Sequence, residues 1–315
     1  MTTVAAIDCG TNSIRLLVAE VDAATGALTD LTRQMRVVKL GQGVDRTGEF
    51  AAEALERTFA ALDAYAATCR DLGVERTRFV ATSATRDARN RDLFLDGVHA
   101  RLGVTPEVIS GNEEASLSFR GVVSAVAGAP SPYLVVDLGG GSTELALGSG
   151  ELESAYSMDV GCVRLTERHL VSDPPTVEQQ AAAVADVRAA LAVATQTVPI
   201  GQAATLIGVA GSITTVTAHA LGLSRYDPIA IHGATLPVEQ VIASCDALIA
   251  ATYAERAAMG FMHPGRVEAI GAGALVWREV VTAVADAVAA SGGQLATVTT
   301  SEHDILDGIA LSIAG

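Results

Sequence analysis

One short pattern that occurs twice constrains the fold more than any other feature of this chain. Residues 133–147 read as an apolar run that ends on Asp137, then three glycines and two hydroxyl residues, then a renewed alternation of apolar and polar residues. Such a pattern is typical of a strand, a tight turn and a second strand. Residues 6–16 repeat residues 135–145 without a gap, and Asp137 lies 129 positions after Asp8. This repetition predicts that one domain has been duplicated.

The two turns have a composition that suits phosphate. Glycine removes the side chain that would keep a ligand from the backbone amides, and it permits positive φ angles, which we expect in the turn that contains Gly139, Gly140 and Gly141. Bare amides, a carboxylate before the turn and hydroxyls after it suit phosphate together with a divalent cation. The alternative is a glycine-rich hairpin turn without a ligand. Arg15 after the first turn could contact phosphate oxygens, and Glu144 after the second could hold water on a metal.

Length and cysteine usage restrict the class of protein. The 315 residues allow about two domains, each with its own core. The sequence contains no uncharged apolar run of about 18 residues and no basic segment followed by an apolar one, so we expect neither a membrane span nor a signal peptide. The four cysteines are scattered without a Cys-x-x-Cys pair, which favours reduced thiols over disulfides or a zinc site. We therefore expect a soluble cytoplasmic protein.

The net charge of −15 argues against a protein that binds nucleic acid through a broad basic face. A phosphate ligand would have to be met locally by arginines and by metal, because the overall field repels it. Lys39 is the only lysine, and all other cationic side chains apart from histidine are arginines. Arginine suits bidentate contacts to phosphate.

The rest of the chain alternates between strand and helix patterns, which indicates α/β domains with mixed sheets. We expect a loop at 41–48, a strand at 104–109, a helix from Ser110 to about 126, and a helix that begins on Pro237. Residues 129–132, Ala-Pro-Ser-Pro, form the best candidate linker. The predicted domains are residues 1–129, completed by the C-terminal helix 302–315, and residues 130–301.

Four segments together resemble a known family. They are Asp8–Arg15, Ala81–Arg86, Ser110–Ala115 and Asp137–Glu144, and they look like the ordered signatures of the exopolyphosphatase/guanosine pentaphosphate phosphohydrolase (Ppx/GppA) family. Residues 208–215 and 232–233 extend the likeness. The resemblance implies two actin-like (ribonuclease H-like) α/β domains with mixed sheets and a cleft between them. Longer members continue into helical C-terminal domains that help hold long chains, so the preferred substrate length is left open.

The resemblance also implies roles for individual residues. Asp137 matches a magnesium-binding aspartate, and Asp8 and Glu144 are outer-shell candidates; the structural alternative for each is a carboxylate that supports a turn. Glu114 matches the base that deprotonates the attacking water, and Arg86 matches a phosphate-contacting arginine. The other residues expected to bind phosphate come from the two turns and from the second half of the chain: Thr11, Asn12, Ser13, Arg15, Gly139, Gly140, Gly141, Ser142, Thr143 and His232.

Two neighbouring glutamates, Glu113 and Glu114, are expected to have different roles. Ser110-x-x-Glu113 reads as a capping box, in which the Glu113 carboxylate reaches back to the first amide of the helix. Glu114 lies about 100° further round the helix and is the better candidate for a base. Its structural alternative is an acid favourably placed near a helix N-terminus. In residues 208–215 we expect Ser212 to be a helix N-cap.

The function expected from this resemblance is magnesium-dependent exopolyphosphatase activity, in which water removes the terminal phosphate of inorganic polyphosphate, with short chains favoured. One alternative is removal of the 5′ γ-phosphate of guanosine pentaphosphate. An alternative from another class is a sensor that binds (p)ppGpp without hydrolysis. No Gly-x-x-x-x-Gly-Lys pattern is present, which excludes a P-loop ATPase. We expect a homodimer.

Overall fold

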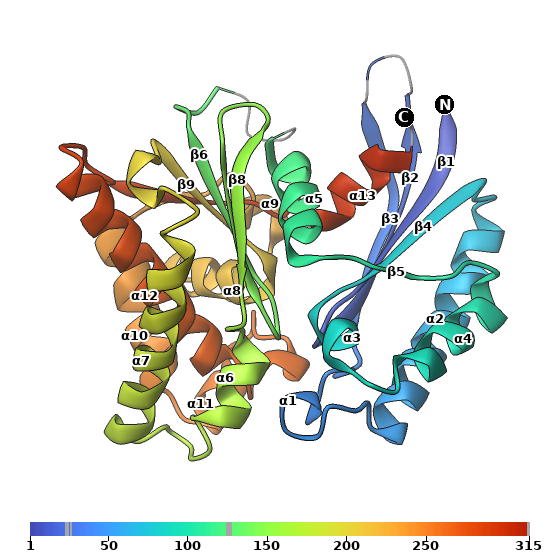
Figure 1. Ribbon diagram of the computed structural model, residues 1–315, viewed down its shortest axis with the longest axis horizontal. Helices are drawn as coiled ribbons and strands as arrows, with labels where there is room; N and C mark the ends of the chain where they lie inside the picture. The colour runs from blue at the N-terminus through green and yellow to red at the C-terminus, as the bar shows by residue number, and fades with distance from the viewer. Residues whose placement is uncertain (23–24, 26, 124–127, 314–315) are drawn as a thin grey trace. The chain divides into compact units, whose positions relative to one another are not determined.

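The computed structural model describes residues 1–22, 25, 27–123 and 128–313 (Figure 1). The chain forms two compact units. Unit 1 consists of Met1–Val122 and Asp304–Gly315, and unit 2 consists of Val123–His303. The helix expected to reach residue 126 is described as far as Val123, and its last predicted residues lie outside the described part of the chain. The predicted domain boundaries, after residue 129 and before residue 302, stay predictions.

Unit 1 is built on a five-stranded mixed sheet. Its first three strands form an antiparallel meander, and its last two strands run parallel to the first. The strand order is β3-β2-β1-β4-β5. The strands are β1 (Thr2–Cys9), β2 (Ser13–Val21), β3 (Leu28–Val37), β4 (Arg76–Ala81) and β5 (Glu107–Val108).

Unit 2 repeats this topology and adds one strand. An antiparallel meander is followed by two strands parallel to its first strand, in the order β10-β11-β9-β6-β7-β8. Both sheets therefore share one order: the third, second and first strands of the meander, followed by the two parallel strands. This shared order confirms the predicted fold class of two actin-like α/β units with mixed sheets. The strands are β6 (Tyr133–Leu138), β7 (Thr143–Gly148), β8 (Leu152–Met158), β9 (Thr205–Val209), β10 (Thr235–Pro237) and β11 (Thr297–Thr300).

Helices cover the sheets within each unit. Those of unit 1 are α1 (Val44–Thr47), α2 (Ala52–Asp71), α3 (Ser83–Asp87), α4 (Arg91–Leu102), α5 (Gly111–Val123) and α13 (Ile305–Ile313). Those of unit 2 are α6 (Cys162–Arg168), α7 (Val177–Ala194), α8 (Ala210–Ala220), α9 (Pro228–Ile231), α10 (Val238–Ala250), α11 (Tyr253–Ala258), α12 (Ile270–Ala290) and the short 3₁₀ helices η1 (Ile200–Gln202) and η2 (Pro264–Arg266).

The two faces of the unit 1 sheet pack against different helices. Side chains alternate along a strand, so neighbouring residues of β1 enter different clusters. Ala5 and Ile7 join the cluster that contains Leu62 of α2 and Phe94 of α4, whereas Val4 joins the cluster that contains Ile309 of α13. Figure 1 shows α2 and α4 together on one face of this sheet, away from α13. The C-terminal helix is therefore part of the core of unit 1.

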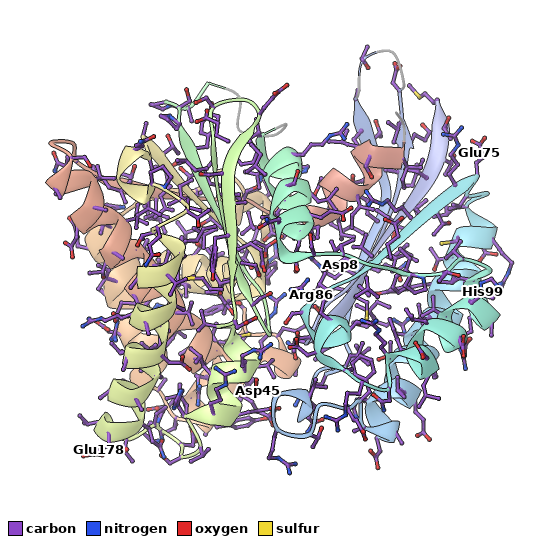
Figure 2. The ribbon with its side chains drawn as sticks, in the orientation of Figure 1. Asp8, Asp45, Glu75, Arg86, His99 and Glu178 are labelled. Carbon is purple, nitrogen blue, oxygen red and sulfur yellow. The ribbon has the colours of Figure 1, made fainter. Side chains whose placement is uncertain are left out.

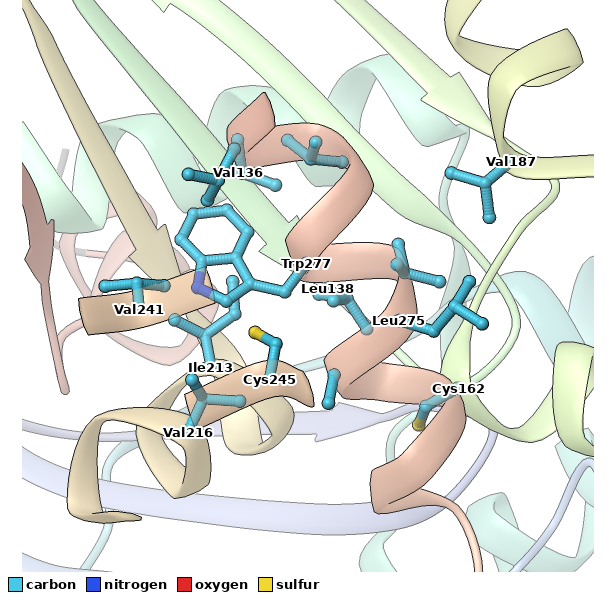
Figure 3. Packing of buried hydrophobic residues seen from close by; sticks show 14 of the residues in the cluster. Val136, Leu138, Cys162, Val187, Ile213, Val216, Val241, Cys245, Leu275 and Trp277 are labelled. Carbon is cyan, nitrogen blue, oxygen red and sulfur yellow. The ribbon is translucent and has the colours of Figure 1, made fainter. Parts of the chain in front are cut away.

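The core of unit 2 is organised around Trp277 of α12 (Figure 3). Its indole is 1% exposed and lies in one cluster with Val136 of β6, Ile213 of α8 and Val241 of α10. Gly208, at the end of β9, has no side chain because a Cβ there would lie 2.8 Å from the indole ring. This glycine of the 208–215 motif is thus explained by packing.

Three sequence-based expectations about local structure were inaccurate. The strand expected at 104–109 is reduced to β5, because Pro106 has no amide hydrogen to donate to a sheet. The expected loop at 41–48 contains the one-turn helix α1. Pro237 ends β10 and occupies the N-cap position of α10, so the helix begins at Val238 and not at the proline.

The four cysteines are free and buried, as expected for packing groups. Burial raises the pKa of each thiol above its usual value. In the part of the chain that the structure describes, no helix combines the length and apolarity needed to cross a membrane.

A close helix crossing in unit 1 yields a stability prediction. A Cβ added at Gly308 of α13 would lie 1.9 Å from the carbonyl oxygen of Leu117, and one added at Gly121 of α5 would lie 2.0 Å from that of Asp304. We expect Gly308→Ala to lower the free energy of unfolding by about 1–3 kcal/mol through overpacking, although alanine normally stabilises a helix relative to glycine. Urea unfolding measures this, with Gly150→Ala, which meets open space, as the control. Equal stability of both variants would contradict a tight crossing.

Candidate functional site

The two repeated turns have the same backbone structure. Turn A (Gly10–Ser13) joins β1 to β2, and turn B (Gly139–Ser142) joins β6 to β7. In each, the first amide donates to the last carbonyl at 3.0 Å: Gly10 to Ser13, and Gly139 to Ser142. The flanking pairs Cys9–Ile14 and Leu138–Thr143 close four-residue connections. The sequence repeat therefore corresponds to one turn built twice.

The glycines of turn B do not have the positive φ angles that the sequence suggested. The glycines with positive φ lie elsewhere, for example at Gly43 and Gly233, and not at Gly139, Gly140 or Gly141. A four-residue hairpin connection is commonly built around a turn with ordinary negative φ angles, which explains the difference. A small residue is instead needed at Gly161, which passes close to turn B. A Cβ on Gly161 would lie 2.5 Å from the Gly140 carbonyl oxygen.

In unit 1, Asp8 at the end of β1 forms a buried ion pair with Arg15 on the adjacent β2. Its Oδ2 accepts hydrogen bonds from Arg15 Nε at 3.0 Å and Nη2 at 2.7 Å. Arg15 Nη1 donates to Asp304, at the start of the C-terminal segment. The guanidinium is thus engaged by two carboxylates of its own unit, and its expected contact with phosphate stays a prediction.

The environment of Asp8 is strongly desolvated. The residue is 5% exposed, and burial raises the pKa of its carboxyl above the usual value. Arg15 opposes this effect because a nearby cation stabilises the carboxylate. Asp8 therefore sits at the carboxyl end of β1 as a partner of Arg15, and its outer-shell role toward metal stays a prediction.

Turn A itself supplies Thr11, Asn12 and Ser13. The Thr11 hydroxyl is buried and has no hydrogen-bond partner among the described residues, and the Thr11 side chain fills the space where a Cβ on Gly41 would lie. The Asn12 carbonyl accepts the amide of Val38 at 3.0 Å. Gly10 also lies next to Thr82, since a Cβ at Gly10 would be 3.8 Å from the Thr82 hydroxyl. Turn A and the segment at 82–86 are therefore neighbours.

Arg86 and Glu114 form the second ion pair of unit 1. Arg86 Nη1 donates to Glu114 Oε2 at 2.8 Å and to the Ile109 carbonyl at 3.0 Å. Arg86 lies on α3, which directly follows β4, and Glu114 lies in the first turn of α5 with 8% exposure. Figure 2 labels Asp8 and Arg86, with Glu75 and His99 further away in the same view. The expected base and the expected phosphate-contacting arginine are thus brought together.

Glu113 has a different environment. Ser110 Oγ accepts the Glu113 amide at 3.2 Å, which is one half of the expected capping box. The Glu113 carboxylate accepts from Arg78 Nη2 at 2.8 Å and does not return to the helix start, so the reciprocal half was wrongly predicted. The cation Arg78 on the neighbouring strand offers a stronger, charge-assisted bond than a neutral amide. Glu113 is therefore half-exposed and paired with Arg78, whereas Glu114 is buried and paired with Arg86.

Unit 2 places two predicted metal residues opposite each other. Asp137 of β6 and Glu144 of β7 are cross-strand partners, with 7% and 1% exposure. Glu144 Oε1 accepts from Ser157 of β8 at 2.7 Å. The Thr143 hydroxyl donates to the Val160 carbonyl at 2.6 Å, and its expected contact with phosphate stays a prediction.

The donor set of unit 2 suits a hard divalent cation. Asp137 and Glu144 offer carboxylate oxygens, and magnesium is commonly held by one or two carboxylates together with water and substrate phosphate. Within the described ranges, no cluster of three or more His, Cys, Asp or Glu side chains is arranged to hold a metal.

The second-half motifs lie at the ends of β9 and β11. Helix α8 begins at Ala210, which has a φ of 70°, so Ser212 lies inside the helix and the predicted N-cap is wrong. The hydroxyl of Thr215 donates to the Gly211 carbonyl at 2.6 Å. His232 Nδ1 accepts the amide of Glu302 at 3.2 Å, and whether His232 contacts phosphate stays a prediction.

Sequence reasoning missed Arg164 and Tyr226 near these motifs. Arg164 Nε donates to the Gly141 carbonyl of turn B at 2.7 Å. Arg266 covers the start of α8, because a Cβ at Gly211 would lie 2.2 Å from its guanidinium carbon. Tyr226 donates to Thr214 at 2.8 Å. The sequence did offer a signal for Arg164. In both halves a segment follows the third meander strand, and Arg164 lies in that segment of the second half.

The chain belongs to the Ppx/GppA phosphatase family, whose sequence model matches residues 17–296. Turn A and turn B are therefore features of a member of a phosphatase family.

Individual relatives agree with this assignment. The chain is 50% identical over 322 aligned residues to "Exopolyphosphatase 2" of Mycobacterium tuberculosis (strain H37Rv), and the alignment covers 100% of this chain and 99% of that protein. A crystal structure of an exopolyphosphatase-like protein has a TM-score of 0.96 at 47% identity, with 99% of both chains covered. The crystal structure of the Aquifex aeolicus family member has a TM-score of 0.78 at 27% identity and covers 99% of this chain and 97% of that chain.

The raised pKa of Asp8 leads to a prediction about pH. Below a pH of about 4 the carboxyl is protonated in both folded and unfolded chains. Above the raised folded pKa it is ionised in both, and folding has to bury the charge, so this group's contribution to stability falls as the pH rises through that range. We expect the unfolding free energy of Asp8→Asn, relative to wild type, to increase from pH 4 to pH 7.

Urea unfolding at several pH values measures this difference, and Asp71→Asn at an exposed helix end is the matched control. A relative stability of Asp8→Asn that declines as the pH rises would contradict the assignment.

Proposed function

We propose that this chain is an exopolyphosphatase, which hydrolyses the terminal phosphoanhydride of inorganic polyphosphate and releases orthophosphate. The observation that carries the proposal is the buried Glu114, held at 2.8 Å by Arg86 in the same unit as turn A. The chain is 50% identical over its full length to a protein that is named exopolyphosphatase, and this identity supports the choice of substrate.

The proposed reaction needs a base, a cation for the phosphate and turns that orient it. Glu114 takes a proton from water while the water oxygen bonds to the terminal phosphorus. The bond between that phosphorus and the bridging oxygen breaks, and the shortened chain leaves with the bridging oxygen and its electron pair. Arg86 stabilises charge on the terminal phosphate and holds the Glu114 carboxylate in position. Positioning and charge stabilisation supply most of the rate increase in such reactions.

Magnesium is part of this proposal. Asp137 would hold the ion, with Glu144 as its outer-shell partner in the same unit. When bound, the ion would neutralise charge on the phosphate oxygens. The all-oxygen donor set of Asp137 and Glu144 supports this choice over a softer metal.

Guanosine pentaphosphate is the second candidate substrate, because it offers a terminal phosphoanhydride of the same chemistry. A sensor that only binds (p)ppGpp is less well supported, since a pure binder gains nothing from a carboxylate such as Glu114 near bound phosphate. Phosphate release from polyphosphate, guanosine pentaphosphate and ATP, measured side by side with magnesium, tests the proposal. We expect the highest kcat/KM for polyphosphate, and no release from polyphosphate would refute it.

We further propose a cytoplasmic homodimer that favours short or medium chains. The four free thiols support a reducing compartment. Each further phosphate needs a nearby cation, because charges beyond about 8 Å are screened in physiological salt, and a chain with a net charge of −15 has few cations to offer. A second copy would extend the available cationic surface.

The division between the two glutamates yields a kinetic prediction. Glu114→Gln should fold and lose about 10²–10⁴ in kcat, the usual contribution of a general base. Glu113→Gln, the matched control one residue away, should keep kcat, because it loses only a half-exposed pair with Arg78. Steady-state phosphate release measures both. Similar losses of kcat in the two variants would contradict this division of roles.

The metal assignment yields a separate prediction. Asp137→Asn removes one negative ligand and should raise the magnesium concentration needed for half-maximal activity by about tenfold or more, the usual scale of a lost charge-assisted contact. Asp159→Asn, a neighbouring acid outside the repeat, serves as the control. Isothermal titration of magnesium into the protein gives a readout independent of turnover. Unchanged magnesium affinity in Asp137→Asn would reject this residue as a ligand.

A further inference from the structure

In both units, the segment that follows the third meander strand forms hydrogen bonds to the repeated turn, which is turn A in unit 1 and turn B in unit 2. In unit 1, the carbonyl of Asn12 in turn A accepts the amide of Lys39 at 2.8 Å, and that of Thr11 accepts the amide of Gly41 at 2.8 Å. In unit 2, the carbonyl of Gly140 in turn B accepts the amide of Arg164 at 3.1 Å. Asn12 and Gly141 occupy equivalent positions of the repeat. These bonds hold carbonyl groups of each turn against the segment that follows the meander.

The residues at these contacts are cationic in both units. Lys39 donates its amide to Asn12, and Arg164 donates its Nε to Gly141 at 2.7 Å. Both side chains are partly buried. Lys39 is also the only lysine of a chain with a net charge of −15. A cationic residue thus follows the third meander strand in each unit and hydrogen-bonds to the turn, through its backbone amide in unit 1 and through both its backbone amide and its side chain in unit 2.

Lys39 is an unexpected residue for its backbone position. Its φ is 50°, in the left-handed region that costs energy for any residue with a Cβ and is favoured by glycine or asparagine. Glycine or asparagine would therefore adopt this backbone conformation with less strain than lysine. Strained residues of this kind are typical of binding sites, where the side chain has a purpose that offsets the strain.

We propose that Lys39 and Arg164 are the cations of turn A and turn B: Lys39 contacts the substrate phosphate at turn A, and Arg164 positions turn B by holding the Gly141 carbonyl. The inference rests on the proposed polyphosphate hydrolysis and deepens it by assigning residues outside the repeated motifs. Turn B needs this cation because the residue after it is Glu144, whereas Arg15 occupies the equivalent place after turn A. Arg15 is itself engaged by Asp8 and Asp304, so turn A also needs another cation.

The test for Lys39 separates charge from backbone strain. Lys39→Gly removes the ammonium group and relieves the left-handed strain, so the protein should be at least as stable to heat as wild type. Its KM for polyphosphate should nevertheless rise about tenfold or more, as expected for a lost charged hydrogen bond. Lys39→Arg keeps the charge and should recover part of the affinity. A KM for Lys39→Gly within about twofold of wild type would overturn the role of Lys39.

The test for Arg164 uses a control on the same helix. Arg164→Gln should lower kcat/KM for polyphosphate about tenfold or more, and Arg164→Lys, which keeps the charge but lacks the Nε–H, should recover only part of it. Arg168→Gln makes the same charge change in α6 at a residue that pairs with Asp186 at 3.2 Å, and it should behave as wild type. Equal effects of Arg164→Gln and Arg168→Gln would overturn the role of Arg164.

Binding of tripolyphosphate, measured by isothermal titration, distinguishes failure of this inference from failure of the proposed function. If the wild type binds but does not hydrolyse polyphosphate, the hydrolytic function fails, and the variants are judged by their dissociation constants. Weakened binding in Lys39→Gly and Arg164→Gln would then still support the two cations. Unchanged dissociation constants in both variants would refute them, whatever the activity of the wild type.

Discussion

The need to pair every buried charge is the constraint on which the site depends. Glu114 and Asp8 are less than a tenth exposed, and each is held by an arginine of its own unit, Arg86 and Arg15. Removing one partner of a buried ion pair typically costs about 3–5 kcal/mol, because the other charge is left uncompensated. These pairs therefore fix the start of α5 against α3, and β1 against β2. A carboxylate fixed in this way can serve as a base without reorganisation during the reaction.

Duplication supplies two similar turns, and later substitutions make them different. Turn A and turn B share the same closing hydrogen bond and follow the same strand order. The residue after each turn is Arg15 in one unit and Glu144 in the other. The two units thus share one turn structure but differ in the charge of the residue that follows it.

The sequence predicted those features that depend on local periodicity. The strands, the repeated turn and the separation of Glu113 from Glu114 follow from alternation, glycine spacing and helix geometry over a few residues. The pairing of Arg15 with Asp304 could not be predicted, because 289 residues separate the two. The position of Ser212 was misjudged because α8 begins two residues earlier, on a left-handed Ala210. Tertiary packing therefore decided the points at which local patterns failed.

The central claim is that water, activated by Glu114, attacks the terminal phosphorus of polyphosphate. Hydrolysis in ¹⁸O-enriched water, with mass analysis of both products, tests it most directly. The account predicts orthophosphate that carries one ¹⁸O atom, and chains that shorten from their ends without ¹⁸O in the remaining chain. Cleavage within the chain, or ¹⁸O in the shortened chain and not in the released phosphate, would contradict it.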